Sequence, residues 1–173
     1  MTSTPLEHAC EDGHVDAIRA LIELGADATD GDLLEAAGRA RDEQSAAEIT
    51  RLLLAAGADP NGPSRFSSSG PLHSALHAAC VDVLVEAGAD IEARDSSKRT
   101  PIYNAVDWSM KRNQEEDEEE ETWGDPGTVA LRLADLGADL VNTGGEPGLV
   151  ECHMEELRRR RAAKSGGGSR GAA

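Results

Sequence analysis

Histidine and cysteine are the residue types in this chain best suited to metal binding or nucleophilic catalysis. His73 and His77 are four residues apart, so a continuous helix would place both imidazoles on one face, where they could share a zinc ion. The sequence contains no HExxH, CxxC, nucleophile-elbow or phosphate-loop motif, and those are the patterns that usually build such sites. We therefore expect no catalytic residue, no bound metal and no cofactor, and a protein that is not an enzyme.

The three cysteines are too few and too widely spaced for a disulfide framework. Cys10 and Cys80 lie among alanines, which predicts that they pack as small apolar side chains. A reducing compartment fits this pattern, so we expect a cytoplasmic protein, with the nucleus as the alternative. No apolar run approaches the roughly 20 residues of a membrane span, and no membrane association is expected.

Four aromatic residues are the candidates for anchoring a partner: Phe66, Tyr103, Trp108 and Trp123. The chain is 39% hydrophobic but only 2% aromatic, so aliphatic side chains must build the core. A rare aromatic side chain then becomes a natural interface anchor. Trp108 has two interpretations, because it could contact a partner or pack against the root of the acidic segment that follows it.

A repeated sequence motif indicates which structural elements position these residues. Gly-Ala-Asp begins at Gly25, Gly57, Gly88 and Gly137, with spacings of 32, 31 and 49 residues. Each occurrence closes an apolar stretch of helical period, as Val15, Ile18 and Leu21 do before Gly25. A repeat of this length predicts a solenoid of stacked helices.

The first unit shows what each repeat contains. Thr4 can cap a helix that starts at Pro5, Gly13 can end it, and a second helix can run from Val15 to Gly25. Thr4-Pro5-Leu6, Gly13-His14 and Gly25-Ala26-Asp27 stand at the offsets of the ankyrin repeat, whose period is about 33 residues. The chain therefore resembles an ankyrin-repeat protein.

This resemblance implies an all-α ankyrin-repeat solenoid of paired antiparallel helices with hairpin-like finger loops. We expect about four repeats plus a C-terminal capping helix, within a domain covering residues 1–157. The units are about 1–30, 31–69, 70–98 and 99–142, the cap is 143–161, and residues 162–173 form a flexible Gly/Ser/Arg tail. Glu151, Glu155 and Glu156 would give the cap a polar outer face.

Three of the units depart from the family pattern. The second begins at Gly31, where Asp32 could serve as the cap, and its segment 37–46 should extend the first helix or widen the turn. In the third unit the first helix could enter at Pro71 with a trimmed turn, which we favour, or at Ala75 in a more truncated pair. The fourth contains an acidic insertion, about 111–127, which explains its 49-residue spacing.

The resemblance also implies a non-enzymatic protein-binding module, or adaptor, that presents a concave groove and a row of finger loops. A family histidine at the positions of His14 and His73 usually bonds backbone across the repeat. Tyr103 stands where the family commonly has histidine, and Asn104 stands at a position that usually faces the groove. The predicted partner-binding residues are His8, Asp12, Arg65, Phe66, Arg94, Arg99, Tyr103, Asn104 and Trp108.

Charge limits the class of partner. The 17 Lys and Arg residues against 33 Asp and Glu residues give a formal net charge of −16. This excess of acids favours a protein partner with a basic surface, argues against broad adhesion to nucleic acid, and leaves us expecting a monomer. Residues 158–173 carry six cations and no acid, so the alternative function is nucleic-acid or chromatin association through this tail. A third possibility is an accessory subunit that uses the acidic insertion as a decoy for basic surfaces.

Overall fold

The computed structural model describes residues 4–64, 69–112, 124–146 and 148–166. These residues form nine helices and no strand. The helices are α1 (Pro5–Glu11), α2 (Val15–Glu23), α3 (Gly31–Gly38), α4 (Glu43–Ala55), α5 (Pro71–Ser74), α6 (Ala78–Glu86), α7 (Pro101–Arg112), α8 (Pro126–Asp135) and α9 (Leu149–Gly166).

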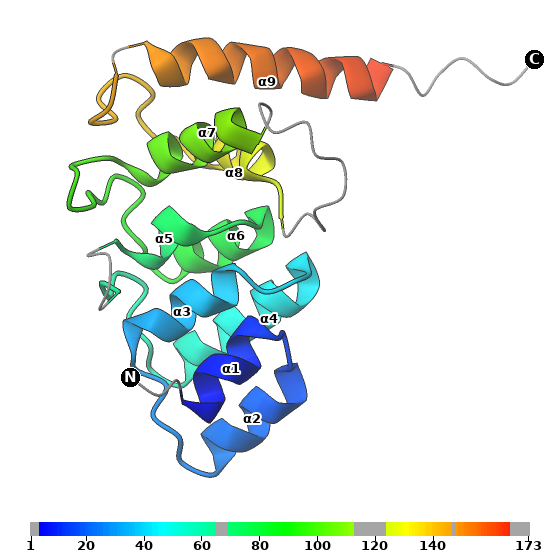
Figure 1. Ribbon diagram of the computed structural model, residues 1–173, viewed down its shortest axis with the longest axis vertical. Coiled ribbons are helices and arrows are strands. Elements are labelled where there is room, and N and C mark those ends of the chain that lie inside the picture. The colour runs from blue at the N-terminus through cyan, green and yellow to red at the C-terminus, as the bar shows by residue number, and fades with distance from the viewer. Residues whose placement is uncertain (1–3, 65–68, 113–123, 147, 167–173) are drawn as a thin grey trace, which may run out of the picture.

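The helices stack in two parallel rows. One row is α1, α3, α5 and α7, and the other is α2, α4, α6 and α8, with each helix contacting the next in its row. The long helix α9 contacts both α7 and α8 and lies across the end of the stack (Figure 1). The loops that lead from one pair to the next emerge on one side (Figure 1), and we call their described parts fingers one to four (24–30, 56–64 with 69–70, 87–100, and 136–146 with 148). This arrangement is the solenoid that the repeat predicts, with the finger loops that the ankyrin resemblance implies.

The Gly-Ala-Asp motif follows the second helix of each repeat and begins the finger. Gly25 has a φ of +88°, its N–H bonds the carbonyl of Ile22, and the next N–H, of Ala26, bonds the carbonyl of Leu21. These two bonds form a Schellman cap, which favours glycine because of its positive φ. Asp27 then accepts the N–H of Thr29 at 2.9 Å and turns the chain into the finger. The same three bonds recur after Gly57, Gly88 and Gly137.

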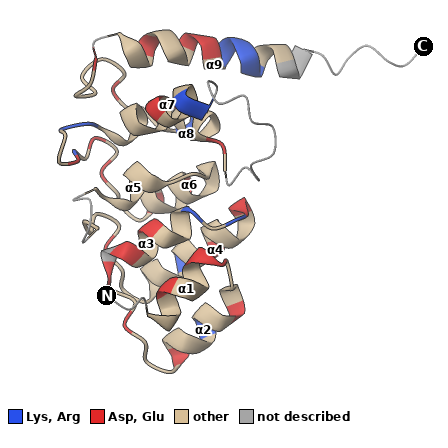
Figure 2. Ribbon diagram, in the orientation of Figure 1, with Lys and Arg blue, Asp and Glu red and all other residues tan. Residues whose placement is uncertain are grey.

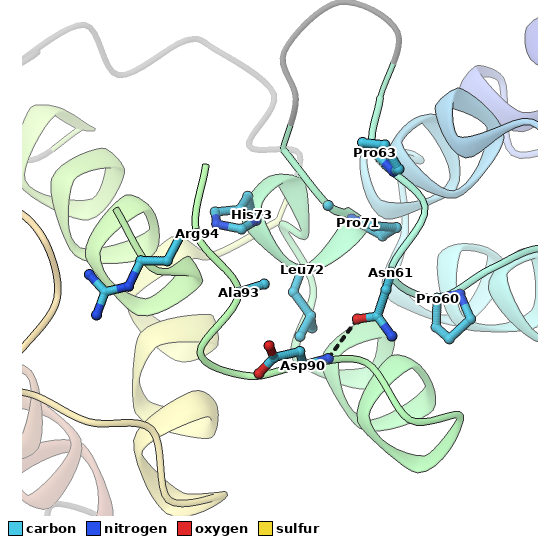
Figure 3. Close-up of a pocket in the computed structure, with 10 residues that line it drawn as sticks. Pro60, Asn61, Pro63, Pro71, Leu72, His73, Asp90, Ala93 and Arg94 are labelled. Atoms are coloured by element: carbon cyan, nitrogen blue, oxygen red, sulfur yellow. Dashed lines mark hydrogen bonds between the residues drawn. The ribbon is translucent and has the colours of Figure 1, made fainter. Parts of the chain in front are cut away.

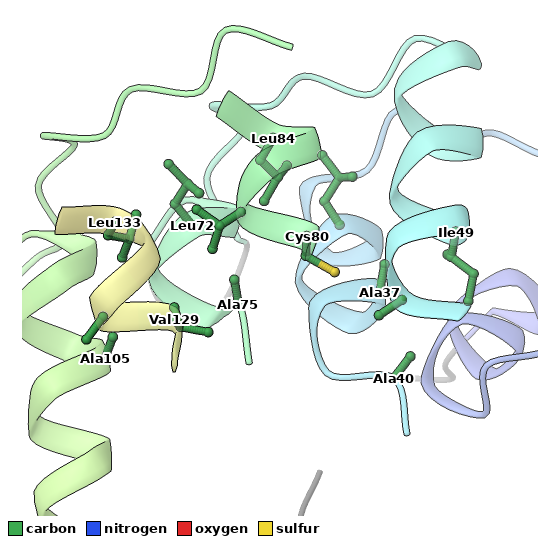
Figure 4. Close-up of a cluster of buried hydrophobic side chains, with 14 of the residues drawn as sticks. Ala37, Ala40, Ile49, Leu72, Ala75, Cys80, Leu84, Ala105, Val129 and Leu133 are labelled. Atoms are coloured by element: carbon green, nitrogen blue, oxygen red, sulfur yellow. The ribbon is translucent and has the colours of Figure 1, made fainter. Parts of the chain in front are cut away.

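Aliphatic and small side chains fill the space between the rows. Ala37, Ala40 and Ala75 are buried beside larger residues such as Ile49 and Leu84, and together they belong to one continuous core (Figure 4). Because alanine has no bulk beyond Cβ, neighbouring helices can approach closely and the layers stay thin. The core therefore extends along the whole stack.

The second unit differs from what the sequence predicted. The cap of α3 is Asp30, whose side chain accepts the N–H of Asp32, and Asp32 lies inside the helix. The first helix and the turn are each only one residue longer than in the first unit, and most of the extra residues lengthen the second helix, because α4 has 13 residues and α2 has nine. Asp42 makes this possible, since its carboxylate accepts the N–H of Ser45 and caps the earlier start.

The third unit follows the favoured register, with its first helix starting at Pro71. Its four-residue α5 is followed by an extended segment, in which Leu76 donates to the carbonyl of Gly38 and accepts the N–H of Asp125. His77 precedes α6 as His14 precedes α2. The trimmed turn is thus replaced by backbone bonds to the units on either side.

The boundaries of the acidic insertion and of the capping helix also differ from those that the sequence predicted. Lys111 and Arg112 continue α7, with Lys111 paired to Asp107, while Asp125 caps α8 and Pro126 is buried. The rest of the insertion, 113–123, including Trp123, lies outside the described residues, as do Arg65 and Phe66. Helix α9 continues to Gly166, past the expected tail boundary at 162, because alanine and lysine favour helix and Arg159 and Arg160 pair with Glu155 and Glu156.

Candidate protein-binding face

We call the row α1, α3, α5 and α7, with Asp12 at the C-cap of α1 and the four fingers, the interaction face. Hydrogen bonds between neighbouring fingers hold its shape. The carboxamide of Asn61 donates to the carbonyl of Gly88 at 3.0 Å and accepts the N–H of Asp90 at 2.7 Å, which joins finger two to finger three (Figure 3). Glu92 accepts the N–H of Asp139 at 2.7 Å and joins finger three to finger four. Fingers two to four therefore form one connected row.

A hollow of about 320 Å³ opens between fingers two and three. Pro60, Pro63 and Pro71 give it stiff apolar walls, and Leu72 and Ala93 line it as well (Figure 3). Its polar lining includes Asn61, His73, Asp90 and Arg94. A hollow with apolar walls and several polar groups suits a side chain of a bound protein.

Four of the predicted site residues meet in one network at finger three and α7. Arg94 donates from Nη1 to the carbonyl of Lys98 at 2.8 Å and from Nη2 to the carbonyl of Asn142 at 2.6 Å. The Arg99 guanidinium lies 5.7 Å above the centre of the Tyr103 ring, and Asn104 donates to the carboxylate of the buried Asp95 at 3.5 Å. Arg94, Arg99, Tyr103 and Asn104 thus organise the face from within.

Asp95 is the centre of this network, and the sequence prediction missed it. Its Oδ1 accepts the N–H groups of Ser97 (2.8 Å) and Arg99 (2.9 Å), while its Oδ2 lies 3.4 Å from the Arg99 Nε. Burial alone would raise the pKa of Asp95, but these hydrogen bonds, the Arg99 charge and Asn104 outweigh it and hold the pKa below its usual range. The one available signal was an aspartate followed by two serines, which favours a turn.

Tyr103 is only 9% exposed. A Cβ built on Gly145 would stand 1.7 Å from the Tyr103 ring, and a Cβ on Gly144 would stand 1.8 Å from the carbonyl oxygen of Lys98. The two glycines therefore let finger four lie directly on Tyr103 and on finger three. As a result, this aromatic residue is mostly covered rather than presented as an anchor.

Two further predicted site residues, His8 and Asp12, lie apart from this network. His8 and Asp12 are exposed on and just after α1, separated from α7 by α3 and α5 in the row (Figure 1). Trp108 is half-buried on α7. The predicted site residues that the structure describes therefore fall in two separate regions. Those at α1 are exposed, and those at finger three are held by hydrogen bonds and packing within the protein.

The two histidines that could have shared zinc contact different carbonyl groups. His73 Nε2 lies 3.1 Å from the Arg99 oxygen, and His77 Nε2 lies 2.7 Å from the Ala40 oxygen. For His73 this confirms the structural role that the family resemblance implies. His14 differs, because it is exposed and its side chain makes no cap hydrogen bond.

The buried cysteines are also structural. Cys10 and Cys80 are fully buried. Burial, followed by the nearby charges of Glu11 and Glu7, raises the pKa of Cys10 to about 12. Burial is likewise the main cause that raises the pKa of Cys80 to about 11. Both remain protonated thiols near neutral pH, as small apolar core residues should.

Within the described ranges, one group of acidic side chains lies close enough together to hold a cation: Glu7, Asp30 and Asp32. Two of them have structural roles, since Glu7 accepts the N–H of Thr4 at 2.7 Å and Asp30 caps α3. None of the helices in the described ranges combines the length and the apolar composition needed to cross a bilayer.

Comparisons with known proteins match this architecture. Family models described as "Ankyrin repeat" match residues 2–30 and 70–96. A Bos taurus protein named cyclin-dependent kinase 4 inhibitor B is 33% identical over 103 residues, which cover 56% of this chain and 76% of that protein. The chain belongs to the ankyrin-repeat family. The Homo sapiens protein of the same name is 31% identical to this ankyrin-repeat protein over 100 residues, 56% of this chain and 72% of that relative. The ankyrin-repeat protein is accordingly a protein–protein interaction module.

Proposed function

We propose that this ankyrin-repeat protein binds a basic segment of a protein partner on its interaction face, as a monomer and by binding alone. The observation that supports this proposal most directly is the net charge of the first two units. Residues 4–64 contain thirteen Asp and Glu residues and four Arg residues, a net of −9. Figure 2 shows red along α1 and α3, the helices that these two units contribute to the interaction face. Opposite charge on a partner would speed association and select against acidic competitors.

The rigidity of the face supports this proposal. Hydrogen bonds already join the described parts of fingers two to four, so a partner would not have to order these parts. Binding to a pre-organised surface loses less conformational entropy, and more of the contact energy remains as affinity. His8 and Asp12 are exposed and available for contact.

Titration of the full chain with a hexalysine peptide tests the electrostatic part of the proposal. We expect backbone amide NMR shifts in α1, α3 and their fingers, with weaker binding for Asp12→Lys. Glu86→Lys, an equal charge change on α6 in the opposite row, is the matched control. Shifts confined to α6 and α8, or equal effects of both substitutions, would contradict it.

A protein kinase is the candidate class of partner, because the two relatives are named as inhibitors of cyclin-dependent kinase 4. Calorimetric titration of the full chain into purified cyclin-dependent kinase 4 is the direct test. We expect saturable binding that Asp12→Lys weakens and Glu86→Lys does not. Absence of binding at micromolar concentrations would remove this kinase as the partner.

The structure gives less support to nucleic-acid association through the arginines of α9. Arg159, Arg160 and Arg161 each contact an acid, namely Glu155, Glu156 and Asp135. Their charge is therefore partly compensated within the protein. We expect no binding of a DNA duplex at physiological salt in a fluorescence-anisotropy titration, and salt-sensitive binding that Arg158→Glu abolishes would restore this alternative.

A further inference from the structure

The tip of finger three, segment 94–99, has the opposite charge to the face around it. It contains Arg94, Lys98 and Arg99 against a single acid, Asp95. Asp95 is buried and is held by Arg99 and two backbone N–H groups. Arg94 and Lys98 are exposed. The charge that the tip presents to solvent is therefore positive, as the blue loop before α7 shows in Figure 2.

The nearest acids are not paired with the cations of the tip. Asp90 and Glu92 lie at the base of finger three, and Asp139 lies at the base of finger four. Each of these carboxylates accepts a backbone N–H: Asp90 from Glu92, Glu92 from Asp139, and Asp139 from Val141. They keep their negative charge at the bases of the fingers, but none of the ion pairs among the described residues joins one of them to Arg94 or Lys98.

The tip is also held rigidly. Lys98 has a positive φ of +62°, its N–H bonds the carbonyl of Asp95 at 2.8 Å, and its own carbonyl accepts from Arg94. The carbonyl of Arg99 lies within hydrogen-bond distance of His73 on α5. A cation on such a fixed loop can meet an anion without first ordering the backbone.

We propose that the tip of finger three binds carboxylate side chains of an acidic segment in the protein partner. This inference rests on the proposed binding function and adds a direction to it. The partner would be basic where it faces α1 and α3 and acidic where it reaches finger three. Only one orientation of such a partner along the row pairs opposite charges at both positions.

Backbone amide NMR of the full chain, titrated with a hexaglutamate peptide, tests this proposal. We expect shifts centred on residues 94–99, and binding at least about tenfold weaker for Lys98→Glu, as the loss of a charged hydrogen-bonding group implies. Arg158→Glu makes the same charge change on α9, away from the fingers, and should leave the shifts unchanged. Loss of the shifts with both substitutions, or shifts at 158–161 alone, would overturn the proposal.

Two further outcomes separate this inference from its alternatives. A phosphoserine peptide that binds the tip when hexaglutamate does not would overturn the carboxylate assignment and indicate a phosphorylated partner. A partner that binds the interaction face with equal affinity to the wild type and to Lys98→Glu would leave the proposed function standing and overturn the role of the tip. If hexaglutamate binds at 94–99 but no protein partner binds the interaction face, the result would support carboxylate binding by the tip and contradict the proposed function.

Discussion

Arg94 donates a hydrogen bond of 2.6 Å from Nη2 to the main-chain carbonyl of Asn142, and this bond joins finger three to finger four. The other side of the guanidinium holds the carbonyl of Lys98. One arginine thus fixes both the shape of its own finger and the position of the next one. Gly145 of finger four also lies against the ring of Tyr103 on α7. The Arg94 hydrogen bonds and this contact therefore hold finger three, finger four and α7 together as one packed unit.

Substitution of Gly145 by alanine should break this unit. The added Cβ would stand 1.7 Å from the Tyr103 ring, so finger four must lift, and we expect a loss of about 1–3 kcal/mol in the free energy of unfolding. The ring signals of the single tyrosine report the change directly by NMR. Glu146→Ala, at an exposed neighbouring position, should alter neither reading. An unshifted tyrosine ring in Gly145→Ala would contradict the contact.

Gly70→Ser should stabilise the protein. Gly70 is the N-cap of α5, its φ of −80° and ψ of 168° suit serine, and a Cβ there would be 3.9 Å from His73 Nδ1. That buried nitrogen has no hydrogen-bond partner, and a serine hydroxyl could provide one while capping the helix. We expect a gain of about 1 kcal/mol in urea unfolding.

Gly57→Ser is the matched control for this effect. Nothing lies within 4 Å of its Cβ position, but its φ is +102°. The same substitution should therefore cost about 1–2 kcal/mol through backbone strain alone. Stabilisation at both glycines, or at neither, would show that cap chemistry at Gly70 is not the cause.

The docking of α9 should weaken in mild acid. His153 Nε2 lies 3.1 Å from the hydroxyl of Ser109 on α7, and burial, then the positive charge of Arg160, lowers the pKa of His153 below 6.5. A histidine whose folded pKa is depressed stabilises the fold above its unfolded pKa, and this contribution is lost as pH falls through the folded value. The difference in unfolding free energy between the wild type and His153→Gln should shrink below about pH 6.5. A difference that grows on acidification would contradict this assignment.

One thiol should react before the protein unfolds. Cys152 is exposed, whereas Cys10 and Cys80 are buried and their pKa values are raised to about 12 and about 11. A chromogenic disulfide reagent should label one cysteine rapidly in the native state and all three in urea. Cys152→Ser should abolish the rapid phase, and a rapid phase that survives this substitution would mean that the core opens around α1 or α6.

The fold followed from local signals in the sequence. Gly25 and its three counterparts mark turns that need a positive φ, and Pro71 marks the start of a helix, so the helix pairs and the third-unit register could be predicted. The candidate site was harder to predict from the sequence, because its contacts join residues distant in the chain. Nothing near Tyr103 indicates that Gly145 will cover it, and nothing near Arg94 indicates that Asn142 will accept its hydrogen bond. Even at short range, Asp30 and Asp32 are equally good caps by residue type, and the structure uses Asp30.

Hydrogen exchange of the full chain, alone and bound to the partner that it captures from a lysate of its source, tests most directly where binding occurs. We predict slowed exchange in α1, α3, α5, α7 and the fingers, with α2, α4, α6 and α8 unchanged. Asp12→Lys should reduce that protection, and Glu86→Lys should leave it intact. Protection confined to α2, α4, α6 and α8, or to residues 158–166 of α9, would contradict the proposed interaction face.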